Sequence, residues 1–219
     1  MVIDLLLAFT IFVTREGLVG GTTANGHVIV ERDWFAALPS RRGLETTVKV
    51  CTQTRCVFLP VWDVGPWNTK DDYWNADRQM WTDLPQGLPQ AQAAFQEGYH
   101  GGLDEFGRKV LNPAGIDLAD GAFWDGLGLV DNAWAEVTFL PPSQAEVTAE
   151  KVLNVRAGPS VSSAVVGGAG RAADLPVQCQ VHGDVVNGVD LWDRLGPGLY
   201  VSHAYVRVPP DWSAPLCPA

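Results

Sequence analysis

Residues 115–119 read Gly-Ile-Asp-Leu-Ala, an apolar run with one acid, Asp117, at its centre. Neighbouring residues in a strand point to opposite faces, so burial of the Ile and Leu would direct the Asp117 carboxyl to the margin of an apolar pocket. Such a setting raises a carboxyl pKa and keeps the group protonated, as a general acid requires. The simpler interpretation is an Asp that caps a helix over residues 118–127, and the motif alone favours this cap.

A second acid lies in a comparable place. Residues 61–66 read Val-Trp-Asp-Val-Gly-Pro, so Asp63 ends an apolar strand before a Gly-Pro turn. Functional groups often sit at strand ends beside turns, but an Asp that bonds to the backbone of its own turn is also common. The glycine-rich stretch 20–26 is not a phosphate loop, because neither Gly-Lys-Ser/Thr nor a helical pattern follows it.

Short β-branched runs bounded by Gly, Pro, Asn and Asp predict an all-β chain. From residue 66 to 113 the pattern changes to a long polar and aromatic stretch, with a helix predicted near 90–97. A segment of that length is usually functional or an insertion. In the first part of the chain the predicted strands cover residues 28–30, 46–50, 57–61 and 133–140.

The length of 219 residues suits two domains, since single domains commonly hold about 100–150 residues. We place the first domain at residues 12–140, a proline-led linker at 141–147, the second domain at 148–209 and a C-terminal tail at 210–219. Short strands separated by Gly-rich turns predict a small barrel for the second domain, over residues 152–155, 165–167, 177–181, 191–194 and 200–208.

The composition restricts the possible partners. The formal net charge of −10 argues against nucleic acid and anionic membranes, because both require clustered Lys and Arg. The four His never occur at a metal-ligand spacing, and no Gly-x-Ser-x-Gly motif is present. We therefore expect a soluble monomer without metal, cofactor or nucleophilic serine.

The four cysteines fall two in each half of the chain, Cys51 with Cys56 and Cys179 with Cys217. Two local disulfides in a secreted, extracellular protein are the favoured interpretation, and free buried thiols in a cytosolic protein are the alternative. The apolar run 2–13 has the length of a signal-peptide core but lacks a basic start and a cleavage site. The run is therefore either a poor signal sequence or a misplaced start whose last residues already belong to the first strand.

Four stretches in this order resemble the RlpA-like double-psi β-barrel: Thr-Ala-Asn-Gly at 23–26, Phe-Ala-Ala-Leu-Pro-Ser at 35–40, Asp63-x-Gly-Pro and Ile-Asp117-Leu-Ala. Bacterial septal-ring lytic transglycosylases, expansins and family 45 glycoside hydrolases share that fold. The resemblance implies a six-stranded barrel in which Asp117 is the main catalytic or essential acid and Asp63 lies across the groove. Lytic members carry a His before the Leu-Pro, where this chain has two alanines, whereas expansins bind and loosen polysaccharide with little or no hydrolysis.

The second half resembles a bacterial SH3 domain. Residues 153–160 read Leu-Asn-Val-Arg-Ala-Gly-Pro-Ser, and they are followed by Trp-Asp-Arg-Leu at 192–195 and Tyr-Val-Ser-x-x-Tyr-Val at 200–206. This resemblance implies a small barrel that tethers the protein to peptidoglycan or acts as an interaction module. Most of the apolar residues in these motifs would simply build that barrel.

Aromatic residues indicate the class of ligand, because Trp and Tyr rings stack on sugars while Asp and Asn bind hydroxyl groups. We expect Trp124 and Trp134 in the core, and the pairs at 41–42 and 71–72 in solvent. The residues predicted to line a polysaccharide groove are Thr23, Asn25, Trp62, Trp67, Asn68, Tyr73 and Trp74.

The motifs and the two resemblances are compatible with three functions. The first is cleavage of a β-linked glycan such as peptidoglycan or cellulose, with Asp117 as general acid and Asp63 as base or electrostatic stabiliser. The second is glycan binding without turnover, and the third is a pair of protein-interaction modules.

Overall fold

The computed structural model describes residues 8–218. Residues 1–7, and with them most of the run in which we considered a signal sequence or a misplaced start, lie outside the described residues. The last residues of that run belong to the first strand, β1 (Ala8–Arg15), as predicted.

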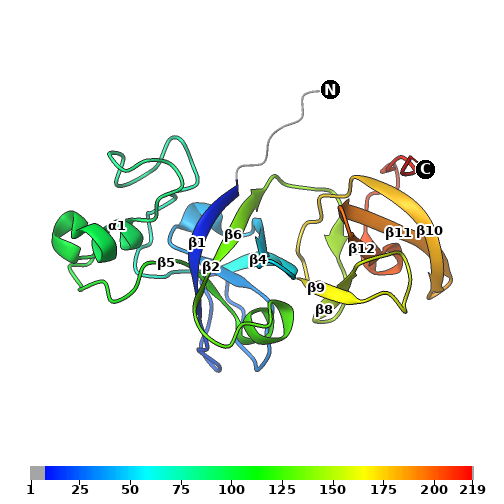
Figure 1. Cartoon of the computed structure of the whole chain (residues 1–219), viewed down its shortest axis with the longest axis horizontal. Helices are drawn as coiled ribbons and strands as arrows, with labels where there is room; N and C mark the ends of the chain where they lie inside the picture. The colour runs from blue at the N-terminus through cyan, green and yellow to red at the C-terminus, as the bar shows by residue number, and fades with distance from the viewer. Residues whose placement is uncertain (1–7, 219) are drawn as a thin grey trace.

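Six strands of the N-terminal half close into a barrel, drawn at the centre of Figure 1. Each strand pairs with two others in the order β1-β5-β2-β4-β3-β6 and back to β1. The pairs β1–β5 and β2–β4 are parallel, and the other four are antiparallel. The predicted all-β fold with a six-stranded barrel is confirmed. The other five strands are β2 (Ala36–Leu38), β3 (Thr47–Cys51), β4 (Cys56–Val64), β5 (Ala114–Leu118) and β6 (Ala133–Leu140).

Alternation along the strands fills the barrel with β-branched and aliphatic side chains, including Ile11, Val48, Val137 and Ile116. On β6 the same alternation corrects one prediction. Trp134 lies between inward-facing positions and is 43% exposed, so it is not a core residue. Trp124 is partly buried against the core, as expected.

Two other predictions for this half need correction. Residues 28–30 form no strand; the loop between β1 and β2 contains only a single bridge, from Thr22 to Val28. In place of a helix over 118–127, β5 continues to Leu118 and only the short η3 (Gly121–Gly126) follows. A further short helix, η1 (Arg41–Gly43), follows β2.

The segment between β4 and β5 forms the predicted insertion. It carries α1 (Gln90–Glu97), at the residues where a helix was predicted, and η2 (Tyr99–Gly102). In Figure 1 this segment projects from the side of the barrel away from the C-terminal half. Asp71 and Asp72 are fully buried in it, paired with Arg78 and Arg42, so the prediction of solvated acids is wrong.

Two disulfides are present. Cys51 pairs with Cys56 across the β3–β4 hairpin, and Cys179 is joined to Cys217 near the C-terminus, as predicted. The second bond fixes the C-terminal segment against β10 (Cys179–Val186), where the Cys217 N–H donates a hydrogen bond to Gln180 O at 2.8 Å.

The C-terminal half has its own hydrophobic cluster, which includes Leu153, Val155, Leu175 and Val201. Its antiparallel pairs are β8–β9, β8–β12, β11–β12, β10–β11 and β7–β13. The division into two domains and the SH3 assignment remain predictions. The elements of this half are β7 (Glu146–Val147), β8 (Val152–Arg156), β9 (Val165–Gly170), β10 (Cys179–Val186), β11 (Val189–Gly196), β12 (Leu199–Ser202), η4 (His203–Tyr205) and β13 (Val206–Arg207).

A shared sheet joins the two halves. Strand β9 pairs in parallel with the start of β4, with Gly167 opposite Cys56. The glycines of β9 make this contact possible: a Cβ on Gly167 would lie 1.7 Å from the Cys56 carbonyl oxygen, and one on Gly168 would lie 2.6 Å from the Trp34 ring. The halves are therefore held by backbone pairing and not only by the chain that runs through Pro141 and Pro142.

Candidate functional site

Asp117 lies on β5 between two residues that the barrel buries completely. Because Ile116 and Leu118 point into the core, alternation along the strand turns Asp117 to the other face, where it is half-buried. Asp117 is therefore a strand residue and not the cap of the helix that follows.

The strand register places four residues in one row. Thr14 of β1 pairs with Asp117, Asp117 pairs with Ala37 of β2, and Ala37 pairs with Asp63 of β4. Side chains of directly paired residues point to the same face, so the two acids share that face. Their Cα atoms are two strand spacings apart, which is about 10 Å. The His that the resemblance leads one to expect would come from β2, where this chain supplies only the methyl group of Ala37.

Burial raises the pKa of Asp117 to about 6, and the nearby charge of Asp63 acts in the same direction. The Thr14 hydroxyl donates a hydrogen bond to Asp117 Oδ1 and opposes this rise. A carboxyl with a pKa of about 6 is partly protonated in mildly acidic solution. It can therefore donate a proton to a bound group near its working pH.

Glu16 is a third acid of this site, and sequence reasoning missed it. It follows β1, and its N–H donates a hydrogen bond to Leu118 O at 2.9 Å. Burial, then a hydrogen bond with Asp63, then the charges of Asp63, Asp117 and Asp120 raise the pKa of Glu16 to about 9. Its buried Oε2 receives no hydrogen bond from any group within residues 8–218. Glu16 is thus protonated at neutral pH and donates a hydrogen bond to Asp63.

Asp63 has a different environment because it is supplied with donors. The N–H groups of Ala24 and Val64 each donate to Asp63 Oδ1 at 2.8 Å, and protonated Glu16 adds another bond. Two of the three acids therefore have a raised pKa, about 9 for Glu16 and about 6 for Asp117. Asp63 is the acid that its neighbours hold by hydrogen bonds.

A cavity of about 370 Å³ opens beside Asp117. Trp67 lines it, with its indole N–H bonded to Asn112 Oδ1 at 3.0 Å. Arg108 lines it too and donates to the Trp67 carbonyl oxygen at 2.6 Å, which fixes the backbone of that residue. The cavity combines one aromatic ring, amide groups, a guanidinium and a titrating acid, and its remaining lining residues are Thr14, Arg15, Pro66 and Asn132.

The predicted binding residues do not all converge on Asp117. Trp67 lies in its cavity, but Trp62 and Asn25 line a separate cavity of about 700 Å³ between the two halves. Thr23 is buried, and its hydroxyl donates to Asn25 Oδ1 at 2.6 Å. That hydroxyl shapes the loop and is not presented to a ligand.

Three other predicted binding residues support the insertion from within. Tyr73 has no exposed surface, and its hydroxyl donates to Gly115 O at 3.1 Å. Asn68 is buried and donates to Gln90 Oε1 at 2.7 Å. The prediction that these two residues line a groove is therefore wrong. Trp74 is half-buried and packs against the barrel core, so it too has a structural role.

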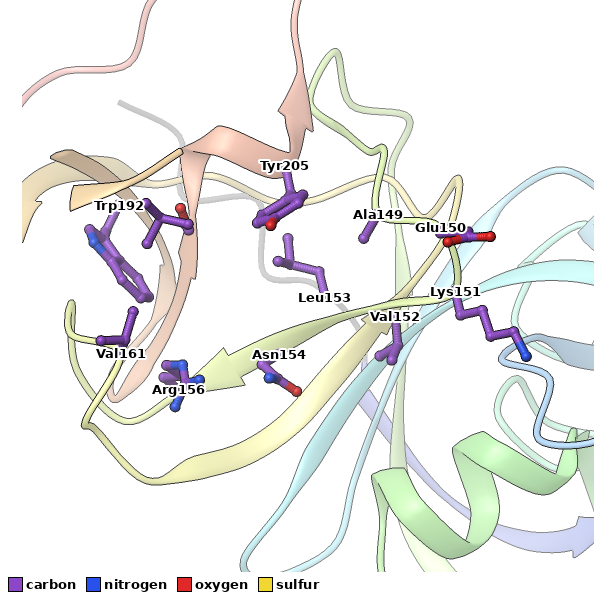
Figure 2. A pocket seen from close by; sticks show the side chains of 12 residues that line it. Ala149, Glu150, Lys151, Val152, Leu153, Asn154, Arg156, Val161, Trp192 and Tyr205 are labelled. Carbon is purple, nitrogen blue, oxygen red and sulfur yellow. The ribbon is translucent and has the colours of Figure 1, made fainter. Parts of the chain in front are cut away.

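Figure 2 shows a third cavity, of about 540 Å³, in the C-terminal half. Trp192 and Tyr205 lie on one side of it, and Val152 and Asn154 of β8 lie on the other. Trp192 is almost fully buried and its indole N–H donates to Asp184 O at 2.9 Å, so the ring builds this half.

Within residues 8–218, no three His, Cys, Asp or Glu side chains are placed to hold a metal ion. None of the helices in this described part of the chain is long and apolar enough to cross a membrane.

Comparison with solved structures finds an expansin from Clavibacter michiganensis, a point mutant in complex with cellohexaose. The two chains are 13% identical, the match covers 90% of this chain and 96% of that one, and the TM-score is 0.32. A likeness this loose assigns neither a fold nor a ligand to this chain.

No curated protein matches the chain. A family model does match residues 7–138, which include the barrel except for the last two residues of β6, and all three acids. The chain belongs to the family described as Domain of unknown function (DUF8814).

Proposed function

We propose that the barrel binds a β-linked polysaccharide in the cavity beside Asp117, and that Asp117 donates a proton to the glycosidic oxygen. The observation that carries this proposal is the half-buried acid with a pKa of about 6, open to a cavity lined by an aromatic ring. General acids in glycoside cleavage have a raised pKa of this kind.

The cavity suits a sugar for a further reason. Sugars present flat C–H faces and rings of hydroxyl groups, and they are bound by aromatic rings with amide and charged groups around them. Trp67 supplies the ring, while Asn112, Asn132 and Arg108 supply the polar groups. Together these groups orient a pyranose ring with one bridging oxygen toward Asp117.

Asp63 acts as an electrostatic stabiliser in this proposal. Glycoside cleavage develops positive charge at the anomeric carbon, and an ionised carboxylate on the same face lowers the energy of that state. The N–H groups of Ala24 and Val64 hold the Asp63 carboxyl in place, and protonated Glu16 bonds to it from the other side. Glu16 is a positioning residue here because it acts through Asp63.

Binding without cleavage is the second candidate, and one observation favours it. Hydrolysis needs a carboxylate base or nucleophile as well as an acid. Asp63 already accepts two backbone hydrogen bonds and one from Glu16, so its carboxyl is occupied by protein donors and not by an attacking water. Under this alternative Asp117 hydrogen-bonds a sugar hydroxyl and the polysaccharide is held without turnover.

We infer in addition that the protein acts outside the cytoplasm, attached to a cell wall through its C-terminal half. The two disulfides suit an oxidising compartment. The wall attachment rests on the SH3-like motifs and is tested by co-sedimentation of the full chain with peptidoglycan.

The experiment incubates the full chain with purified peptidoglycan or cellulose and analyses soluble products by mass spectrometry. Asp117→Asn keeps the size of the side chain and removes the proton, and Glu97→Gln, at the exposed end of α1, is the matched control. Anhydro-sugar ends lost in Asp117→Asn indicate a lytic transglycosylase, and new reducing ends indicate a hydrolase. Co-sedimentation without products indicates binding alone, whereas neither products nor binding contradicts the proposal.

A further inference from the structure

The cavity of about 700 Å³ between the two halves is larger than the one beside Asp117 and has no part in the function proposed above. One wall comes from the N-terminal half and includes Trp62, Asn25 and Glu45. The other comes from the C-terminal half and includes Lys151 and Arg171. A cavity of this volume lies within the range of small-ligand sites.

The N-terminal wall is apolar with an acidic rim. Trp62 stacks against Phe35 with ring centroids 5.6 Å apart, and this fixes the indole that lines the cavity. Glu45 is exposed at the rim and accepts one hydrogen bond, from the Asn25 amide at 3.0 Å. Asp33 also lines this wall, but its carboxylate is bound by His27 at 2.8 Å and by a backbone N–H. Glu45 is thus the acid of the N-terminal wall that is available to a ligand.

The opposite wall carries two cationic side chains, Lys151 and Arg171, on chain segments joined by a backbone hydrogen bond. Arg171 N–H donates to Lys151 O at 3.0 Å, so the two residues project from adjoining chain segments. Within residues 8–218 neither forms an ion pair, although Glu150 of the same wall is next to Lys151. Lys151 also lines the edge of the Trp192 cavity, and in Figure 2 its side chain points toward the N-terminal half.

The two walls are fixed relative to each other before any ligand binds. Pairing of β4 with β9 joins them through the backbone. Asp174 N–H adds a cross-connection to Thr47 Oγ1 at 2.8 Å. Preformed walls lower the ordering cost of binding.

Backbone strain also gathers at this cavity. Glu45 has φ +59° and Ala172 has φ +65°, and both residues line the cleft. Non-glycine residues rarely adopt this conformation, and they do so preferentially at ligand sites.

We propose that this cleft binds a short peptide that carries both a free ammonium group and a free carboxylate. Glu45 stands on the wall opposite Lys151 and Arg171, and within residues 8–218 neither cation forms an ion pair with Glu45 or with Glu150 of its own wall, so the space between the walls fits a ligand with both charges. The ammonium group would bind Glu45, the carboxylate would bind Lys151 and Arg171, and the aliphatic part would lie on Trp62. This site is separate from the one at Asp117 and does not depend on the function proposed there.

The test uses three forms of one probe, unblocked trialanine, N-acetyl-trialanine and trialanine amide, titrated into the full chain by calorimetry. The unblocked peptide should bind about tenfold more tightly than either blocked form, a difference of about 1.4 kcal/mol. Lys151→Ala combined with Arg171→Ala should weaken the unblocked peptide to the level of the amide and leave the amide unchanged. Glu45→Gln should weaken the unblocked peptide to the level of N-acetyl-trialanine and leave the affinity for N-acetyl-trialanine unchanged.

Two control variants separate this result from general effects. Lys70→Ala removes an exposed charge that does not line the cleft, and Asp117→Asn disables only the other site. Both should bind trialanine like the wild type. Equal affinity for the three probes, no binding of trialanine at millimolar concentration, or charge variants that weaken all three probes alike would each overturn the proposal.

Discussion

Replacement of Glu16 by Gln should change how the stability of the protein depends on pH. The pKa of Glu16 is about 9 in the folded chain, against 4.5 for an ordinary Glu. Above pH 4.5 the unfolded chain loses this proton while the folded chain keeps it. The folded state then binds more protons, so the free energy of unfolding of the wild type falls as the pH rises from about 4.5 to about 9.

The size of the effect follows from the shift. Each pH unit in which only the folded state is protonated costs about 1.4 kcal/mol. Because Glu16 is only partly buried, solvent screening reduces the loss between pH 4.5 and 7 to about 2 kcal/mol. Glu16→Gln is neutral at every pH and still carries a donor for Asp63, so it should lose this dependence and be the more stable protein at pH 7.

Urea unfolding followed by Trp fluorescence measures this directly, because the chain contains nine Trp. Wild type and Glu16→Gln are compared at intervals from pH 4.5 to 9 with the disulfides intact. Asp117→Asn is the control: it removes the decline between about pH 3.8 and 6 that comes from the raised pKa of Asp117, and it keeps most of the Glu16 dependence, whose first cause is burial. If the curves of wild type and Glu16→Gln run parallel over the whole range, Glu16 is not protonated as described.

Three further predictions concern binding and stability. Trp67→Ala should weaken polysaccharide binding about tenfold, measured by affinity electrophoresis, because one aromatic contact is lost. Tyr73→Phe should leave binding unchanged and lower the free energy of unfolding by about 1–2 kcal/mol. Equal binding by both variants would contradict the assignment of the cavity. Gly168→Val should destabilise the chain by about 1–3 kcal/mol, because its side chain would overlap a tryptophan at the joint between the halves; calorimetry checks this, and an unchanged melting temperature would count against the shared sheet. Replacing Cys179 and Cys217 by Ser should cost about 4 kcal/mol, since their bond closes a loop of 38 residues; retention of full stability in urea would show that the tail is held by other contacts.

Local pattern predicted those elements whose sequence is strongly periodic. The predicted strand at 133–140 and the predicted helix at 90–97 match β6 and α1, because alternation and helix propensity decide these segments locally. The loop before β2 was misjudged, since its three β-branched residues at 28–30 find no neighbouring strand to pair with.

The acids of the candidate site show the limit of local reasoning. Asp117 and Asp63 could be found because each ends or occupies an apolar strand. Glu16 could have been found in the same way, as a polar residue directly after β1. Its partner is Asp63, however, and they meet only because the barrel closes, which no short stretch of sequence encodes.

Ion pairs of buried acids account for the wrong predictions in the segment between β4 and β5. Tyr73 and Asn68 were predicted in a groove because acids surround them in the sequence. Those acids are buried, and Asp71 is paired with Arg78, seven residues away. With its charge compensated, the acidic segment packs inward and takes Tyr73 with it.

We propose that Asp117 is a titrating acid at a glycan site. Carbon-13 NMR of the Asp side-chain carboxyls, assigned by comparison with Asp117→Asn, gives its pKa with and without a bound β-linked oligosaccharide. A pKa of about 6 that shifts when the oligosaccharide binds is the predicted result. A pKa near the ordinary 3.8 that does not respond to the sugar would contradict the claim.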